Sequence, residues 1–281
     1  MIRRRGLRRR AAGPVARADM DLTEPPLFEA AAALHPSRHG GHVWTRPDSL
    51  EFARTLGAVP LALAEVLRAA AFLPVAIATG PVPRPMVVLS AAPGQPSPLI
   101  VEGRIAGRYL PAILRFYPFL PMPGGAPDAL GGDLRGGFLM EGRPGAGWHP
   151  VYGPDGQLSA PTAERVAALA TWQAGRQAAL VAARALSEAG VLCPSPVLSD
   201  AGWLSVDPDR LMGLPAPQVE ALNRTGALAL GYALLTAASH LPCLVEGRGA
   251  VAPRAAASAS AASGFIAAFA QAGADLAEDA P

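Results

Sequence analysis

The sequence predicts an α+β fold, in which an antiparallel sheet of short strands from the N-terminal half packs against long helices from the C-terminal half. Two runs rich in β-branched residues, 75–79 and 86–90, are separated by a proline-rich loop, which is typical of an antiparallel strand pair. Apolar residues recur at helical spacing over 162–189, with Pro161 at the start and Gly190 just beyond the end. Strands that precede helices along the chain indicate the α+β class.

The other elements of the N-terminal half follow from local patterns. Residues 1–40 show no sustained periodicity, so we expect a tail and an entry loop. Ser49 is a candidate N-cap for one helical turn through Leu56. Alternating apolar residues over 59–63 predict a strand, and the alanine-rich stretch 65–71 predicts a helix. Further short strands are expected at 99–102, 137–140, 148–152 and 203–206.

The remaining segments are assigned from their glycine, proline and alanine content. The Gly- and Pro-rich stretch 121–136 predicts a mobile loop, because such residues favour neither helix nor ladder. A second long helix is expected over 217–239, and residues from 247 onward are Ala/Ser-rich, with a short amphipathic pattern around Phe265, Ile266 and Phe269. We therefore divide the chain into three parts: a basic tail and entry loop (1–42), one α+β domain (43–245) and a low-complexity C-terminus (246–281).

Composition excludes several classes of protein. The 281 residues are 51% apolar and 16% charged, with a mean hydropathy of +0.25, which is too apolar for a disordered polymer and too interrupted for a multi-span membrane protein. Seven of the 24 basic residues, all arginine, precede the first acid, Asp19, which leaves 17 arginines against 22 acids. The body of the protein is mildly acidic, so we expect no nucleic-acid partner.

The basic N-terminus has two interpretations. Its arginines could bind anionic lipid or RNA, but runs of this kind are usually solvated extensions, and Met20 is an alternative start. The stretch that follows, 11–29, is interrupted by Gly, Pro and charged residues, so it does not resemble the apolar core of an export signal. Cys193 and Cys243 lie far apart and outside any CxxC spacing, which favours reduced thiols. We therefore expect a cytoplasmic protein.

One uncharged run has the length of a membrane span. Thr225–Val245 contains 21 residues, which just reaches the ~20 needed to cross a bilayer. The run includes His240 and Pro242 and continues an amphipathic stretch that begins near Pro217. We expect a buried helix and no transmembrane span.

Three histidines have a spacing that suits a metal. On a helix, His35, His39 and His42 would share one face. Pro36 and the glycine pair 40–41 make that helix improbable, and no carboxylate stands at a ligand spacing. We therefore expect no metal site.

Catalytic motifs are missing from the sequence. It contains no GxGxxG, GxxxxGK[ST], GxSxG, HExxH or SxxK pattern, so we expect no cofactor and assign no catalytic residue. A catalytic site assembled from distant residues stays open, because such sites are defined by geometry.

The most informative segment spans 108–119. Pro111 can open a helix and Pro118 ends it, which allows about two turns. Arg108 and Arg115 are seven residues apart, about 10 Å along a helix axis. Their side chains would share a stripe away from the core.

This segment supplies the candidate site residues. In a functional interpretation, Arg108 and Arg115 clamp an anion beside the aromatic walls of Tyr109 and Tyr117. In the structural alternative, Arg115 pairs with a carboxylate of the same domain, and Glu65, at the end of the predicted strand, is the expected partner.

The same segment resembles the SapC family of bacterial proteins. The most specific match is Tyr109-Leu110-Pro111 with Arg115, Tyr117, Pro118 and Phe119. Weaker matches follow the same order along residues 43–245: Phe52-Ala53, Val59-Pro60-Leu61, Ala64-Glu65, Val151-Tyr152, Asp155-Gly156, Leu211, Gly213-Leu214, 226–230 and Ser239. The chain departs from the family at Ile105, where a Trp is usual, and at 138–142, where an acidic strand is usual.

The resemblance implies a family that is named for association with bacterial surface-layer proteins and that has no established catalytic residues. We expect a non-catalytic accessory protein that binds a small molecule or a protein partner. The alternatives are an enzyme or enzyme subunit that acts on a small anionic substrate, with Arg115 and Tyr117 in its pocket, and a surface-layer-associated structural protein.

Overall fold

The computed structural model describes residues 31–92, 94–121, 130–143, 145–198 and 202–245. The described residues form two compact units, each built from separate stretches of sequence: unit 1 from the stretch that ends at Arg46 and from Phe116–Ala170, and unit 2 from Pro47–Arg115 and the stretch that begins at Thr171. The expected tail and the amphipathic pattern near Phe265 fall outside the described residues. The domain boundaries that we expect near residues 42 and 245 stay predictions.

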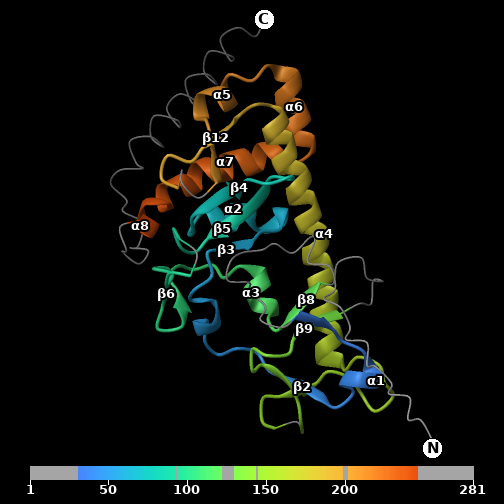
Figure 1. The fold of residues 1–281 in the computed structure, drawn as a ribbon. Helices are drawn as coiled ribbons and strands as arrows, with labels where there is room; N and C mark the ends of the chain where they lie inside the picture. The colour runs from blue at the N-terminus through green and yellow to red at the C-terminus, as the bar shows by residue number, and fades with distance from the viewer. Residues whose placement is uncertain (1–30, 93, 122–129, 144, 199–201, 246–281) are drawn as a thin grey trace, which may run out of the picture. The chain divides into compact units, whose positions relative to one another are not determined.

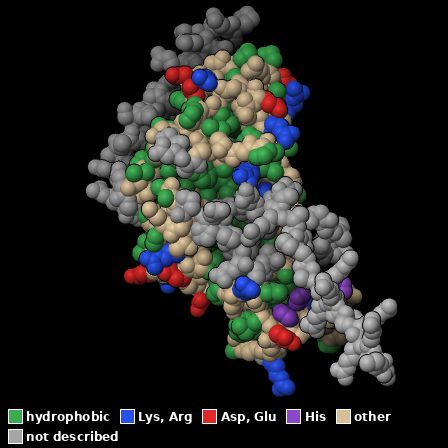
Figure 2. All heavy atoms as spheres, viewed as in Figure 1, with side chains coloured by type: hydrophobic (Ala, Val, Ile, Leu, Met, Phe, Trp, Pro, Cys, Tyr) green, Lys and Arg blue, Asp and Glu red, His purple; other side chains and the backbone are tan. Residues whose placement is uncertain are grey.

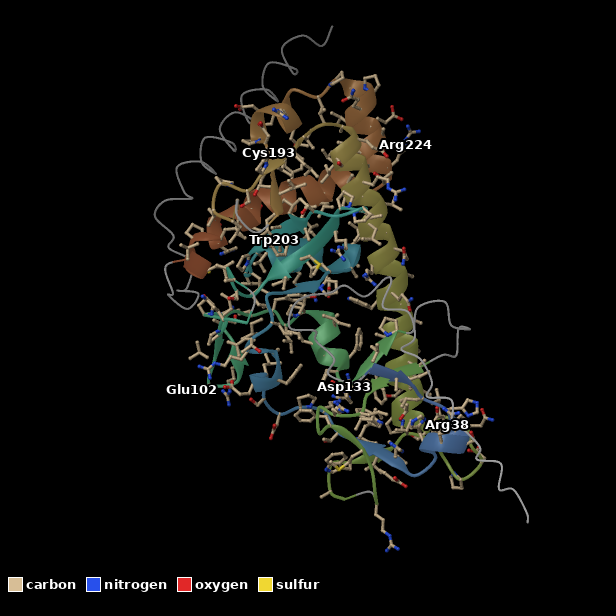
Figure 3. All side chains as sticks on the ribbon, viewed as in Figure 1. Arg38, Glu102, Asp133, Cys193, Trp203 and Arg224 are labelled. Carbon is tan, nitrogen blue, oxygen red and sulfur yellow. The ribbon has the colours of Figure 1, made fainter. Side chains whose placement is uncertain are left out.

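Unit 2 contains a five-stranded antiparallel sheet with the order β12-β13-β4-β5-β3. Its strands are β3 (Ala58–Pro60), β4 (Val75–Ala78), β5 (Arg84–Val88), β12 (Leu192–Pro194) and β13 (Trp203–Val206). The β4–β5 pair is antiparallel, with Val75 opposite Val87, which confirms the strand pair expected on either side of the proline-rich loop. Cys193 and Trp203 mark β12 and β13 in Figure 3.

Helices α2 (Val66–Ala70) and α7 (Ala227–Ala237) complete the core of unit 2. Helix α7 contacts α2 and strands β4 and β13, as Figure 1 shows. It buries Leu230, Ala233 and Leu234, because these positions recur on one helical face. The small residue Gly231 lets this helix approach Leu211 closely.

Unit 2 also contains several short elements. These are η1 (Glu51–Ala53), η2 (Leu63–Glu65), β6 (Ile100–Val101), β7 (Arg104–Ile105), α3 (Ala112–Phe116), α5 (Pro208–Met212), α6 (Ala216–Arg224), η4 (Ala238–His240) and α8 (Pro242–Val245). The last residue of α3, Phe116, belongs to unit 1. The expected turn after Ser49 is confirmed as η1, where the Ser49 hydroxyl accepts a hydrogen bond from the Glu51 amide at 3.2 Å.

Unit 1 contains two small antiparallel sheets. One has the order β1-β9-β8, from Ala31–Ala33, Leu130–Asp133 and Phe119–Pro121; the other has the order β10-β2-β11, from Leu139–Glu141, His42–Trp44 and His149–Pro150. Trp44 lies in the core, edge-on to Phe119 with ring centroids 5.0 Å apart. Its indole Nε1 donates to the Thr162 hydroxyl at 2.8 Å.

The long helix expected over 162–189 is confirmed as α4 (Ala160–Glu188), and Gly190 follows it with a φ of 70°. Its residues up to Ala170 belong to unit 1 and the others to unit 2. The antiparallel sheets of short strands and the C-terminal helices confirm the α+β class.

Two expected loops are wrong in the parts that the structure describes. Within 31–40, the chain forms β1 and helix α1 (Pro36–His39). Within 121–136, the chain forms β9, which pairs with both β1 and β8. Glycine is suited to this strand because a Cβ on Gly132 would overlap the side chain of Leu139.

The expected single helix over 217–239 is also wrong, since it divides into α6 and α7 at Gly226. This glycine has a φ of 73°, and a Cβ there would lie 2.8 Å from Cδ2 of Leu63. The expected strand over 59–63 ends at Pro60, so Glu65 does not end a strand and lies in η2 instead.

The apolar stretch Ala227–Val245 is long and apolar enough to cross a membrane by length and composition alone. Helices in the cores of soluble proteins meet the same criterion, and 39% of this stretch's most apolar window is buried in the fold. The absence of a transmembrane span stays a prediction.

Candidate functional site

The candidate site lies in unit 2 around the buried carboxylate of Glu65, which is only 8% exposed. Its Oε2 accepts hydrogen bonds from the Tyr109 hydroxyl at 2.6 Å and from the backbone amide of Ala112 at 3.1 Å. Its Oε1 accepts from the Ala62 amide at 3.1 Å and from the Trp172 indole at 3.3 Å. Four donors from three distant parts of the chain therefore converge on one acid, which is how a buried carboxylate is stabilised.

Local sequence explains two of these four bonds. Glu65 stands three residues after Ala62, the N-cap of η2, and its side chain reaches back to the N-cap amide as glutamate does in a capping box. Ala112 begins α3 directly after Pro111, so its amide has no partner inside the helix. A carboxylate at this helix start also interacts favourably with the helix dipole.

The electrostatics of the cluster fix Tyr109 in its neutral form. Burial raises the pKa of the Tyr109 phenol well above its ordinary value of 10.0, and the hydrogen bond to Glu65 raises it further. The positive charges of Arg115 and Arg68 act in the opposite direction. Tyr109 therefore acts as a hydrogen-bond donor in this site at neutral pH.

Two arginines follow residues of the Glu65 cluster in α2 and α3. Arg68 follows Glu65 by three residues in α2, and Arg115 follows Ala112 by three residues in α3. Both side chains are exposed, and both influence the Tyr109 hydroxyl electrostatically. We call this pair the Arg68–Arg115 surface.

The four predicted ligand-binding residues differ in burial and are divided between the two units. Arg108 is exposed, Tyr109 is buried against Glu65, and Arg115 is exposed in the last turn of α3; all three belong to unit 2. Tyr117 belongs to unit 1, where it is buried. The expected pairing of Arg115 with Glu65 stays a prediction.

Tyr117 takes part in a second buried tyrosine–carboxylate pair. Its hydroxyl donates to Oδ2 of Asp133 at 2.9 Å, and Oδ1 of Asp133 accepts from the Arg135 amide at 3.1 Å. Asp133 is fully buried at the end of β9, as labelled in Figure 3. Gly136 lies so close to the Tyr117 hydroxyl that a Cβ there would overlap it.

Sequence reasoning missed Trp172 and Asp133 as parts of these clusters. Trp172 lies in the long helix expected over 162–189 and is buried with its apolar residues, but its indole N–H also donates to Glu65. Asp133 was assigned to a loop. An indole or a carboxyl group that is buried needs a hydrogen-bond partner, and that requirement is the signal available in the sequence.

Part of the histidine segment forms the short helix α1, because Pro36 occupies the first helical position, where proline is tolerated. A helix that carries all three histidines on one face is not formed, as expected. His35 precedes this helix, His39 ends it, and His42 lies on β2. Across the residues that the structure describes, no three His, Cys, Asp or Glu side chains gather into a group that could hold a metal ion.

The fold and the Glu65 cluster define a class: an α+β protein in which a buried, hydrogen-bonded carboxylate joins two short helices. The family model described as SapC matches residues 34–244, and the chain belongs to the SapC family. The comparisons with curated proteins and with solved structures gave no match.

Proposed function

We propose that this SapC-family protein is a non-catalytic accessory protein that binds a small anionic molecule at the Arg68–Arg115 surface. The observation that carries the proposal is the shared anchor of α2 and α3. Glu65 is the N-cap residue of α2, and its side chain accepts the first amide of α3. Arg68 and Arg115 therefore lie on two helices that meet at Glu65, and both influence the Tyr109 hydroxyl electrostatically.

Charge and exposure support an anionic ligand. Among the described residues, no carboxylate lies within ion-pair distance of Arg68. Arg115 is exposed as well, and Arg108, next to Tyr109 in the sequence, adds a third exposed guanidinium. Guanidinium groups bind carboxylate and phosphate oxygens through paired hydrogen bonds, so this surface suits either group.

The state of the polar groups beneath this surface supports a non-catalytic role. Glu65 already accepts four hydrogen bonds, and the raised pKa of Tyr109 keeps its proton in place at neutral pH. A general acid or base works best with a pKa near the operating pH. These groups are therefore better suited to holding the two helices than to transferring protons.

The location of the protein belongs to the same proposal. Cys193 and Cys243 are free thiols, which is compatible with the cytoplasm. The surface-layer association implied by the family name is the alternative. Fractionation of the native host cells followed by immunoblotting distinguishes the two locations.

Calorimetric titration at low ionic strength tests the binding site. Inorganic phosphate and citrate serve as probes, first with the native protein and then with the Arg68→Gln/Arg115→Gln double variant. We expect the double variant to bind at least tenfold more weakly, since both guanidinium groups are lost. The matched control is Arg224→Gln, which removes an exposed arginine from α6.

The proposal is wrong if neither probe binds the native protein at millimolar concentration, or if the double variant binds as well as Arg224→Gln does. Turnover of a small anionic substrate by the native protein would favour the enzyme alternative.

A further inference from the structure

Helix α1 in unit 1 is held by two histidines, one at each end. His35 is its N-cap, with extended backbone angles of φ −140° and ψ 133°. The His39 amide donates to the His35 carbonyl oxygen at 2.8 Å, and the His35 amide donates to Nδ1 of the His39 ring at 2.9 Å. His35 and His39 are therefore joined by two hydrogen bonds across one helical turn.

The second of these bonds depends on the protonation of His39. In a capping box, a glutamate or glutamine side chain accepts the N-cap amide, and it can do so at neutral pH without titrating. An imidazole nitrogen accepts a hydrogen bond only while it carries no proton, and the imidazolium ion has a donor on both nitrogens. Histidine is the side chain that gains a proton between about pH 5 and 8.

Little else stabilises this helix. Helix α1 has four residues, and none of them is fully buried. A helix of this length is not stable through its own backbone bonds. Its polar side-chain supports are the His39 cap and the His35 ring, whose Nδ1 accepts the Ser37 amide at 3.4 Å and contacts the Ser37 hydroxyl at 2.8 Å.

The groups around His39 include charges of both signs. The His42 ring lies edge-on to the His39 ring, with centroids 4.8 Å apart, and Glu141 stands opposite His42 in the β10–β2 register. Figure 2 shows histidine side chains near one another on this face of unit 1. The other charged groups nearby are Arg38 on α1 itself and Asp155 in the turn whose Gly156 lies against Pro36.

His42 limits how this cluster takes up protons. Its Nδ1 is buried and, within the described part of the chain, has no hydrogen-bond partner. Burial lowers the pKa of His42, positive charge on His39 lowers it further, and Glu141 opposes both effects. A charge on His39 therefore adds to the cost of a second charge on His42.

We infer that His39 is a pH-sensitive latch for α1: the neutral ring holds the N-cap amide of His35, and protonation releases this amide and opens the helical turn. The latch lies in unit 1 and is independent of the binding function proposed for unit 2.

Nuclear magnetic resonance of the full-length protein between pH 8 and pH 5 tests the latch. We expect the His35 amide resonance to shift with the same midpoint as the His39 imidazole. One pH unit below that midpoint, the intact bond remains in about one tenth of the molecules. The matched variant is His39→Gln, whose side-chain oxygen can accept the amide at every pH, so the part of the His35 amide shift that follows the ring of residue 39 disappears.

A second variant separates the latch from the general charge of the cluster. In His42→Gln, the His35 amide and the His39 imidazole still titrate together, because the bond between them is intact. The inference is overturned if the His35 amide does not follow the His39 imidazole, or if the same amide titration persists in His39→Gln.

Discussion

The Tyr109 hydroxyl donates a 2.6 Å hydrogen bond to the carboxylate of Glu65, 44 residues earlier in the chain. Both side chains are buried. Because the same carboxylate accepts the first amide of α3, the bond fixes the most distinctive segment of the sequence to the turn that begins α2. The attachment of this segment to the start of α2 can therefore be tested by replacing one acid.

Replacing Glu65 tests the cluster directly. Glu65→Ala leaves four donors without their acceptor, and we expect a loss of about 3–5 kcal/mol in the free energy of unfolding. Glu65→Gln keeps one side-chain oxygen as an acceptor, but its NH2 group cannot accept the hydrogen bonds of the remaining donors. We therefore expect a loss of about 2 kcal/mol in the free energy of unfolding. Urea denaturation measures both values.

The control for this pair is Glu51→Gln, which removes an exposed carboxylate that pairs with the exposed Arg54. We expect its effect to stay below about 1 kcal/mol. Equal losses for Glu51→Gln and Glu65→Gln would contradict a stabilising role for the cluster.

A double-mutant cycle decides between the two interpretations of Arg115. Tyr109 and Glu65 share a buried hydrogen bond, so Tyr109→Phe and Glu65→Gln should couple by about 1–3 kcal/mol. Arg115 is exposed, and we expect Arg115→Gln to couple to Glu65→Gln by less than about 1 kcal/mol. A coupling as large as that of Tyr109 would identify Arg115 as a structural partner of Glu65 and weaken its assignment to the ligand.

Tyr109 also predicts the behaviour of the protein in alkali. Burial and the bond to Glu65 raise its pKa, so the folded state keeps a proton that the unfolded state releases above pH 10.0. The stability that this group contributes is complete below pH 10.0 and is lost as the pH rises toward the folded pKa. Denaturation at pH 9 and above should therefore show a steeper alkaline loss in the native protein than in Tyr109→Phe; identical slopes would contradict the prediction.

Regular elements with a strong local pattern could be predicted from the sequence. The β4–β5 pair is visible because β-branched runs flank a proline-rich loop, and α4 is visible because its apolar spacing continues between Pro161 and Gly190. In both cases local preference and tertiary packing favour the same structure.

Elements that depend on distant residues could not be predicted in this way. Strand β9 contains two glycines and has poor strand propensity, yet it pairs on both sides because Leu34 and Leu139 need the space that Gly132 leaves. The break between α6 and α7 depends on the approach of Leu63 to Gly226. For the site, the sequence of 108–119 identified Tyr109 as a candidate residue. The four donors around Glu65 could not be predicted, because they come from parts of the chain that only the fold brings together.

Acid should destabilise the protein through His240. Burial lowers the pKa of this histidine below its ordinary 6.5, and hydrogen bonding to the backbone of Ala70 and Ala71 opposes the shift only in part. As the pH falls below 6.5, the unfolded chain takes up a proton before the folded one does. The contribution is therefore complete above pH 6.5 and is lost as the pH falls through the folded pKa.

Melting temperatures of the native protein and of His240→Gln, measured between pH 8 and pH 5, check this prediction. We expect the native protein to lose more stability across that range than the variant. His42→Gln provides the comparison, because His42 has a lowered pKa too but lies in unit 1. A native profile that is flat below pH 6.5 would contradict the prediction.

The close approach of Gly136 to Tyr117 predicts that Gly136→Ala lowers the stability of the protein and that Tyr117→Phe relieves part of this loss. A Cβ at Gly136 would overlap the Tyr117 hydroxyl and lie 3.2 Å from Oδ2 of Asp133, so Gly136→Ala must displace a buried, hydrogen-bonded pair. We expect a loss of about 2–3 kcal/mol, measured by denaturation. Gly142→Ala is the control, because a Cβ at Gly142 meets nothing within 4 Å.

Tyr117→Phe removes the overlapping oxygen but leaves the ring in place. On its own this substitution should cost about 1–2 kcal/mol, since Asp133 loses a donor. Combined with Gly136→Ala, it should recover part of the loss caused by the added methyl group, so that the double variant is more stable than the sum of the single effects predicts. Strict additivity would mean that the methyl group is accommodated without moving Tyr117, and that the close approach of Gly136 does not hold the Tyr117–Asp133 pair in place.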